Sequence, residues 1–193
     1  GVITSLVYGS SIYSLVSTFI VSGASIFFSY VTDDIAHGRQ EQVGHQITEI
    51  SCLFIAAVLP LVLILIICSQ EIISILFGHG AFDETAVLYA GQALRGYAVA
   101  LVPLCIRELF TRLQYGYRDS KGPMISSTIS ILCNIPLTIL LGRSIGVLGI
   151  TLATSLSIAV CSILNMHTAR KLNRFIHLGD FLKPIPYFLI GSA

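Results

Sequence analysis

The sequence predicts an all-α protein: a polytopic transmembrane helical bundle with about five complete spans and the start of a sixth. Three observations predict this fold class. The chain has 193 residues and is 54% hydrophobic but only 11% charged, whereas soluble domains carry roughly 25% charged residues. Its apolar runs are about as long as a membrane-spanning helix needs. They lack the strict alternation of barrel strands, and only helices or closed barrels satisfy backbone groups in lipid.

Polar, turn-rich segments separate the apolar runs. The first run contains no charged residue and ends before a polar loop that begins at Asp33. The second has Glu49 at one rim and ends ahead of the loop around Gly78. The first two predicted spans are therefore 3–31 and 47–68.

The later runs are bounded in the same way. The third is entered beside Arg95 and ends at a charged stretch that Pro123 closes, and a tight turn at Gly142 separates the fourth from the fifth. A basic linker then leads to a sixth run. The corresponding spans are 86–113, 124–141 and 147–166, with the sixth starting over 184–193. Because the chain begins with Gly and stops inside an apolar stretch, we expect it to be part of a longer membrane protein.

The basic residues give the bundle an orientation. Loops rich in Lys and Arg face the cytoplasm. Nine of the eleven Lys and Arg residues lie in or beside alternate loops: Arg39, then Arg107, Arg112, Arg118 and Lys121, then Arg170, Lys171, Arg174 and Lys183. We therefore expect the segments 33–46, 117–123 and 167–183 to be cytoplasmic, which agrees with five spans.

Hydroxylated residues form a stripe along the first predicted span. They recur every three or four residues, at Ser11, Ser14, Thr18, Ser22, Ser25 and Ser29. At 100° per residue they fall within an arc of about 80°. Such a stripe either allows a neighbouring helix to pack closely or faces a hydrated cavity. Six hydroxyls in register are more than one close crossing needs, which favours the cavity or its gate.

Four charged residues accompany the third predicted span. Arg95 either faces a cavity or a partner, or extends its side chain to the membrane surface. Glu108 and Arg112 are four residues apart and can pair on one helix face. Together with Arg107 they form either a charged rim that binds an anionic head group or a structural ion pair.

The sequence gives no indication of an enzyme. It contains no GxSxG, no Walker A loop and no HExxH, which are motifs of hydrolases, nucleotide-binding proteins and zinc proteases. The five cysteines are scattered and form no CxxC pair. We therefore expect no catalytic residue, no metal site and no cofactor. A net charge of +1 gives no case for nucleic-acid binding.

Four blocks follow one another in the middle of the chain. They are EIISILFGHGAFD at 71–83, ALRGYA at 93–98, RELFTRLQYGYRDSKGP at 107–123 and GVLGITLATS at 146–155. In this order they resemble the MurJ/MviN family of lipid II flippases, which has an LLFxxGAF loop, an A-L-x-x-Y-A helix start, an R-x-L-x-R-x-F-Y-x-x-x-D-x-K/R-x-P stretch and a G-x-x-G-x-x-x-A-T-S helix start.

The resemblance implies the C-terminal half of a fourteen-helix flippase of the MOP exporter superfamily, with 1–193 as a partial membrane transport domain. It implies a multi-pass protein of the bacterial cytoplasmic (inner) membrane, active in peptidoglycan and cell wall biogenesis. The substrate would be an undecaprenyl-diphosphate-linked glycolipid such as lipid II, moved by alternating access that uses a coupling ion or the membrane potential. The alternatives are a MATE-like ion-coupled multidrug exporter and a flippase for another polysaccharide lipid intermediate.

The first predicted span departs from the family pattern. In the flippases that it resembles, this helix carries an Arg and, three residues later, a Glu, within a cavity that binds the anionic lipid. Alignment on Tyr8 places Ser11 and Ser14 at these positions, and Val16 stands near a proline of the family. Hydroxyls thus replace charges here, which leaves the exact lipid open.

Overall fold

The computed structural model describes residues 2–77 and 84–176, and these residues form six α-helices. The runs 78–83 and 184–193, with the expected loop around Gly78 and the expected sixth span, lie outside the described residues. The helices are α1 (Val2–Ala36), α2 (Gln40–Ile67), α3 (Ser69–Phe77), α4 (Glu84–Gly116), α5 (Lys121–Ile145) and α6 (Val147–Leu172). Each long helix covers one predicted span and continues into the polar residues beside it.

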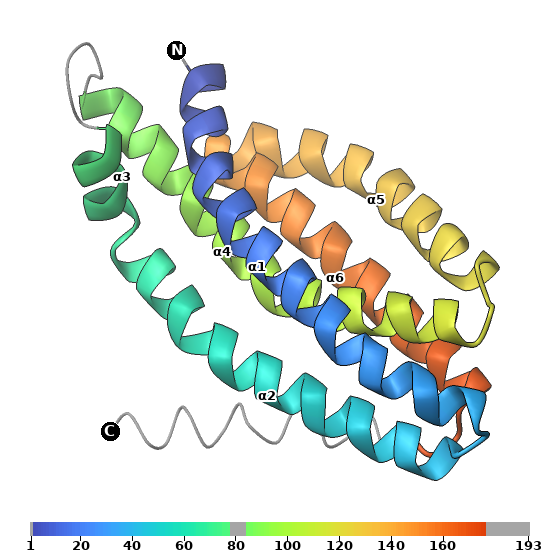
Figure 1. Cartoon of the computed structure of the whole chain (residues 1–193). Coiled ribbons are helices and arrows are strands. Elements are labelled where there is room, and N and C mark those ends of the chain that lie inside the picture. The colour runs from blue at the N-terminus through green and yellow to red at the C-terminus, as the bar shows by residue number, and fades with distance from the viewer. Residues whose placement is uncertain (1, 78–83, 177–193) are drawn as a thin grey trace, which may run out of the picture.

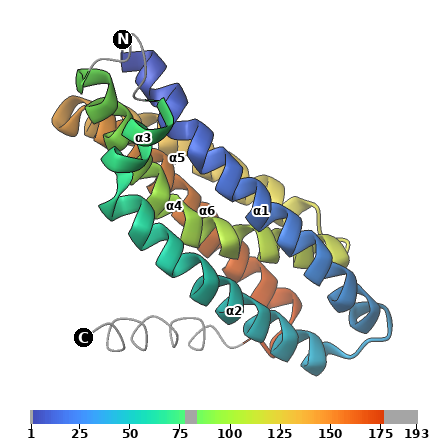
Figure 2. The ribbon, with the colours of Figure 1, turned by 60° about the vertical axis from the view of Figure 1, so that its left-hand side comes forward.

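Helix α4 lies at the centre of the bundle. It packs against α1, α2, α3 and α6, and α5 is attached mainly through α6. Figures 1 and 2 show the resulting arrangement, with α1 and α2 on one side of α4 and α5 and α6 on the other. The core around α4 has two parts, one centred on residues such as Leu94 and Leu101 and the other on Phe110 and Leu113.

Four of the described helices are long and apolar enough to cross a membrane: α1 from Thr4, α2, α5 and α6. The chain is therefore a multi-pass transmembrane helical bundle. Helix α4 is less apolar, because Arg95, Arg107, Glu108 and Arg112 are spaced along it. The third predicted span, 86–113, stays a prediction. Its support is the position of α4 among four helices that can cross a membrane.

The described parts of the three basic segments meet at one end of the bundle. The Asn173 side-chain Nδ2 donates hydrogen bonds to the Gln40 carbonyl oxygen at 2.8 Å and to the Tyr117 hydroxyl at 3.0 Å. Asn173 follows α6, Gln40 begins α2 and Tyr117 follows α4, so the loops lie on the same side (Figure 1). This common side agrees with the charge pattern. That it faces the cytoplasm stays a prediction.

A glycine sets the position of α1 on α4. A Cβ atom at Gly9 would lie 2.8 Å from the Ala93 Cβ and 2.9 Å from the Ala90 carbonyl oxygen. Both distances are shorter than van der Waals contact, so the two helices can approach this closely only because position 9 has no side chain. This contact fixes which face of α1 is turned toward α4.

Candidate functional site

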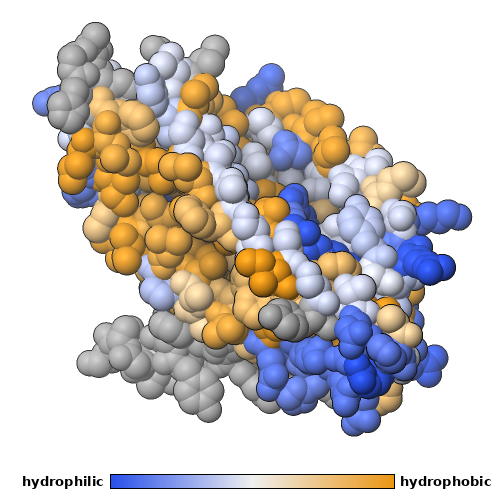
Figure 3. Space-filling view, viewed as in Figure 1, coloured by the Kyte–Doolittle hydropathy of each residue, from blue (hydrophilic) through white to orange (hydrophobic). Residues whose placement is uncertain are grey.

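The hydroxyl stripe of α1 points away from the rest of the bundle. The buried face of α1 carries Ile12, Ile20, Ala24 and Val31. The six predicted side chains are all exposed: Ser11, Ser14, Thr18, Ser22, Ser25 and Ser29. The stripe is therefore not a packing surface between the described helices. Close packing against a neighbouring helix, the first of its two interpretations, does not hold for this part of the chain. In Figure 3 it appears as a pale band along α1, beside the apolar surface over α2.

Several hydroxyls of α1, in the stripe and beside it, donate back to the helix. Ser10 and Ser11 both donate to the Val7 carbonyl oxygen at 2.8 Å. Ser17 and Thr18 donate to the Ser14 carbonyl at 2.9 and 2.8 Å. A hydroxyl oxygen that donates in this way keeps its lone pairs. The stripe therefore offers a row of hydrogen-bond acceptors to whatever lies against it.

The three charged residues near the C-terminal end of α4 form one cluster. Arg107 Nη2 lies 2.6 Å from Glu108 Oε1, and Arg112 Nη2 lies 3.6 Å from Glu108 Oε2. The predicted i, i+4 pair is therefore present. The Glu108 side chain is only 14% exposed, so its charge is stabilised mainly by the two guanidinium groups. The cluster as a whole carries one positive charge.

Arg112 connects this cluster to α1. Its Nη2 donates to the Val21 carbonyl oxygen at 3.0 Å, and Ser25 Oγ donates to the same oxygen at 2.9 Å. The Arg112 Nε is buried and has no hydrogen-bond partner among the described residues. The charged cluster and the hydroxyl stripe therefore adjoin each other in the middle of α1.

Arg95 does not join this group. Its Nε donates to Ser69 Oγ at 2.6 Å, at the start of α3, and Ser69 is fully buried. The sequence offered a cavity, a partner or the membrane surface for this side chain. The structure gives it a partner on α3, a helix that was not among the predicted spans. Arg95 anchors α3 against α4.

A buried polar group joins α4 to α6, and sequence reasoning missed it. Gln114 Nε2 donates to the Asn165 carbonyl at 3.1 Å, and Asn165 Nδ2 donates to Thr111 Oγ1 at 2.8 Å. Both amide side chains are fully buried. Asn165 is a polar residue inside the apolar run 147–166, and this signal could have identified it.

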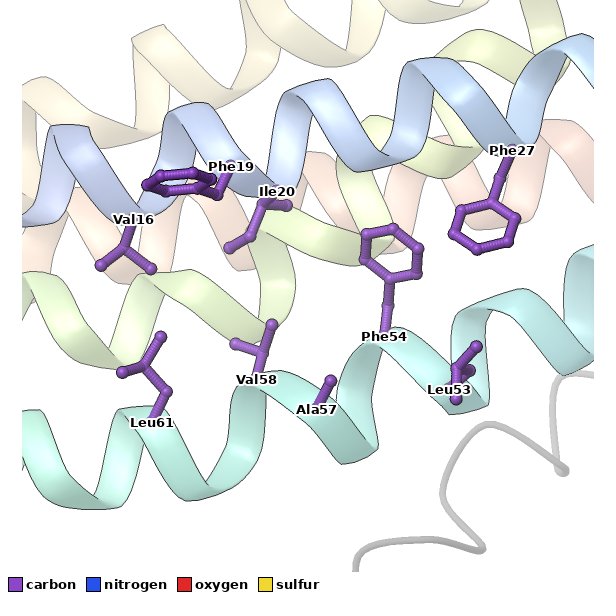
Figure 4. Close-up of a pocket in the computed structure, with 9 residues that line it drawn as sticks. All are labelled: Val16, Phe19, Ile20, Phe27, Leu53, Phe54, Ala57, Val58 and Leu61. Atoms are coloured by element: carbon purple, nitrogen blue, oxygen red, sulfur yellow. The ribbon is translucent and has the colours of Figure 1, made fainter.

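An apolar groove between α1 and α2 was also missed. It has a volume of about 390 Å³ and nine lining residues, all apolar and divided between the two helices. Figure 4 shows that Ile20 and Phe27 of α1 and Phe54 of α2 point into the space between the two helices. Residues such as Phe19 and Leu53 read in the sequence as ordinary lipid-facing residues, so no local pattern distinguishes a groove.

Comparison with known proteins shows which family this chain is similar to. A family model described as lipid II flippase MurJ matches residues 1–189. A probable lipid II flippase MurJ of Thermotoga maritima is 36% identical over 99 residues, which are 51% of this chain and 21% of the relative. Lipid II flippase MurJ of Thermosipho africanus is 28% identical over 153 residues, 79% of this chain and 31% of the relative.

A solved structure has the same fold. It is described as lipid II flippase MurJ in an inward closed conformation, and it matches with a TM-score of 0.81 and 26% identity over 98% of this chain and 40% of that chain. The chain thus spans between a fifth and a third of the curated relatives above. The family match over residues 1–189 establishes that the chain belongs to the lipid II flippase MurJ family.

Proposed function

We propose that this chain is part of a flippase that moves a lipid II-like, polyprenyl-diphosphate-linked cell-wall precursor across the bacterial cytoplasmic membrane. Support comes from the family match and from relatives named as lipid II flippases. Because the chain spans only part of those relatives, the activity belongs to the longer protein. The protein would transport its substrate without making or breaking a bond, so it would not be an enzyme.

The exposed hydroxyl face of α1 is the observation that carries this proposal. A membrane offers no hydrogen-bond partners, so a row of six hydroxyls on one face of a spanning helix favours a position against protein or a water-filled cavity. Here the face lies opposite the side of α1 that packs on α4. We infer a central cavity between this bundle and a second bundle from the rest of the protein, open to each side of the membrane in turn.

The site residues suit different parts of such a substrate. The hydroxyls of Thr18 and Ser25 donate to their own helix, so their oxygens can accept hydrogen bonds from sugar hydroxyls. The diphosphate needs positive charge, and Arg112 and Arg107 provide it beside α1, partly neutralised by Glu108. Arginine suits this role because its planar donors match phosphate oxygens.

Growth complementation tests the proposal. The full-length protein should restore growth and peptidoglycan synthesis in a bacterium depleted of its own lipid II flippase. A variant without two central hydroxyls, Thr18→Val with Ser22→Ala, should lose this rescue at unchanged membrane abundance. The matched control is Leu15→Ala, which changes an exposed apolar residue of the same helix. Absence of rescue by the wild type, together with ion-dependent drug efflux, would instead indicate a multidrug exporter.

A further inference from the structure

We propose that α3 is an interfacial helix, which seats one side of its outward face in the membrane surface at the end of the bundle opposite the basic segments. The partner is the boundary between the lipid head groups and the acyl chains. The inference goes beyond the proposed function, because it concerns how the bundle sits in the membrane and does not depend on the transported substrate.

Helix α3 is held on the bundle along one side. Arg95 Nε donates to Ser69 Oγ at 2.6 Å, and Ile73 is fully buried. At the C-terminal end of α3, Phe77 contacts Tyr8 of α1, with ring centroids 4.6 Å apart. A helix of nine residues is too short to be stable alone in water, so these contacts determine which side of α3 faces outward.

The outward face of α3 is divided lengthwise into a polar side and an apolar side. With Ser69 placed at 0° and each residue turned by 100°, Ser74 and Glu71 fall at about 140° and 200° and form the polar side. The apolar side occupies the next arc, from about 240° to 340°, and consists of Ile75, Ile72 and Leu76. A helix with separate polar and apolar sides is typical of the membrane interface.

The apolar side of α3 is exposed although its side chains are large. Ile75 is 73% exposed and Leu76 is 57% exposed. Ile64 and Ile67, at the adjoining end of α2, are exposed as well, and Figure 3 shows the apolar surface passing from α3 onto α2. Because α2 is long and apolar enough to cross a membrane, this continuity favours lipid as the partner over another protein surface.

The length of α2 places α3 at the membrane surface. Between Ile50 and Ile67, α2 contains no charged residue, and this stretch is about 27 Å long as a helix. The hydrocarbon core of a bilayer is about 30 Å thick, so Glu49 lies at one edge of the core and Ile67 at the other. Helix α3 begins at Ser69, directly beyond this second edge. Figures 1 and 2 show it at the same end of the bundle as the N-terminus.

Nitroxide spin labels on the full-length protein in lipid nanodiscs test the orientation of α3. The labels are attached at Ile75→Cys on the apolar side and at Ser74→Cys on the polar side, in a protein whose own accessible cysteines are replaced by alanine. Both positions are exposed, so neither label should change the melting temperature. Oxygen, which dissolves preferentially among acyl chains, should relax the label at Ile75→Cys more than a water-soluble nickel chelate does. The order should reverse at Ser74→Cys, the matched control on the adjacent residue.

Two further labels make the result decisive. Leu76→Cys on the apolar side and Ile67→Cys at the end of α2 should both be relaxed more by oxygen, as Ile75→Cys is. A label at Ile75→Cys that neither reagent relaxes would show that protein covers the apolar side, and this would overturn the inference. Stronger relaxation by the nickel chelate at Ile75→Cys, with oxygen dominant at Ile67→Cys, would show that α3 stands in water above the membrane and would also overturn it.

Discussion

Replacing Gly9 with alanine should separate α1 from α4 and destabilise the protein. The new Cβ would lie 2.8 Å from the Ala93 Cβ, whereas carbon atoms rest at about 3.5–4.0 Å. The helices must therefore move apart by roughly 0.7 Å or more. Overpacking of this kind costs about 1–3 kcal/mol, and the better helix propensity of alanine offsets about 0.5–1 kcal/mol. The expected net loss is on the order of 1 kcal/mol.

Thermal unfolding of the full-length protein in detergent measures this loss. Gly142→Ala is the matched control: its Cβ would meet the Ile150 Cγ1 at 3.1 Å, and a side chain can move where a backbone cannot. Gly142→Ala should therefore be neutral or stabilising. Adding Ala93→Gly to Gly9→Ala should recover part of the loss in a double-mutant cycle, because the Ala90 carbonyl still opposes position 9. A Gly9→Ala protein as stable as the wild type would refute this account of the contact.

Three further variants test other parts of the structure. Asn173→Leu removes three hydrogen bonds from a buried side chain and should lower the free energy of unfolding by about 1–3 kcal/mol; an unchanged melting temperature would mean that the three loops are not joined there. Arg118 has a φ of +60°, so Arg118→Gly should raise stability by about 1 kcal/mol, measured in the same unfolding assay. The double variant Ser11→Arg with Ser14→Glu introduces the residues of the resembling flippases at two exposed positions. This variant should leave the melting temperature unchanged. A marked decrease would mean that these side chains lie inside a packed interface.

The sequence predicted the long helices well and their ends less well. Apolar runs mark the part of a helix that lies in lipid, but backbone hydrogen bonding continues into polar residues. Helix α2 therefore begins at Gln40 although its predicted span begins at 47. Helix α3 has only nine residues, too few to cross a membrane, so a search for spans did not include it.

The angular grouping of the hydroxyls followed directly from helix geometry, and the structure confirms that they share one exposed face. Their direction did not follow from the sequence, because it depends on the contact of Gly9 with α4. Long-range partners were equally inaccessible. Arg95 and Ser69 are 26 positions apart, and no periodic pattern connects them. The groove depends on how α1 and α2 diverge, which only the assembled bundle shows.

The hydrogen bonds of the α1 hydroxyls have a mechanical consequence. The carbonyls of Val7, Ser14, Val21 and Phe28 each accept at least one side-chain donor, and they recur every seven residues, almost on one line along the helix. Each of these oxygens divides its acceptor capacity between the side chain and the helix ladder, which weakens the ladder there and favours curvature. Helix α1 therefore flexes more easily in one plane than in others. A long helix with one compliant edge can curve without breaking while Gly9 stays in contact with α4.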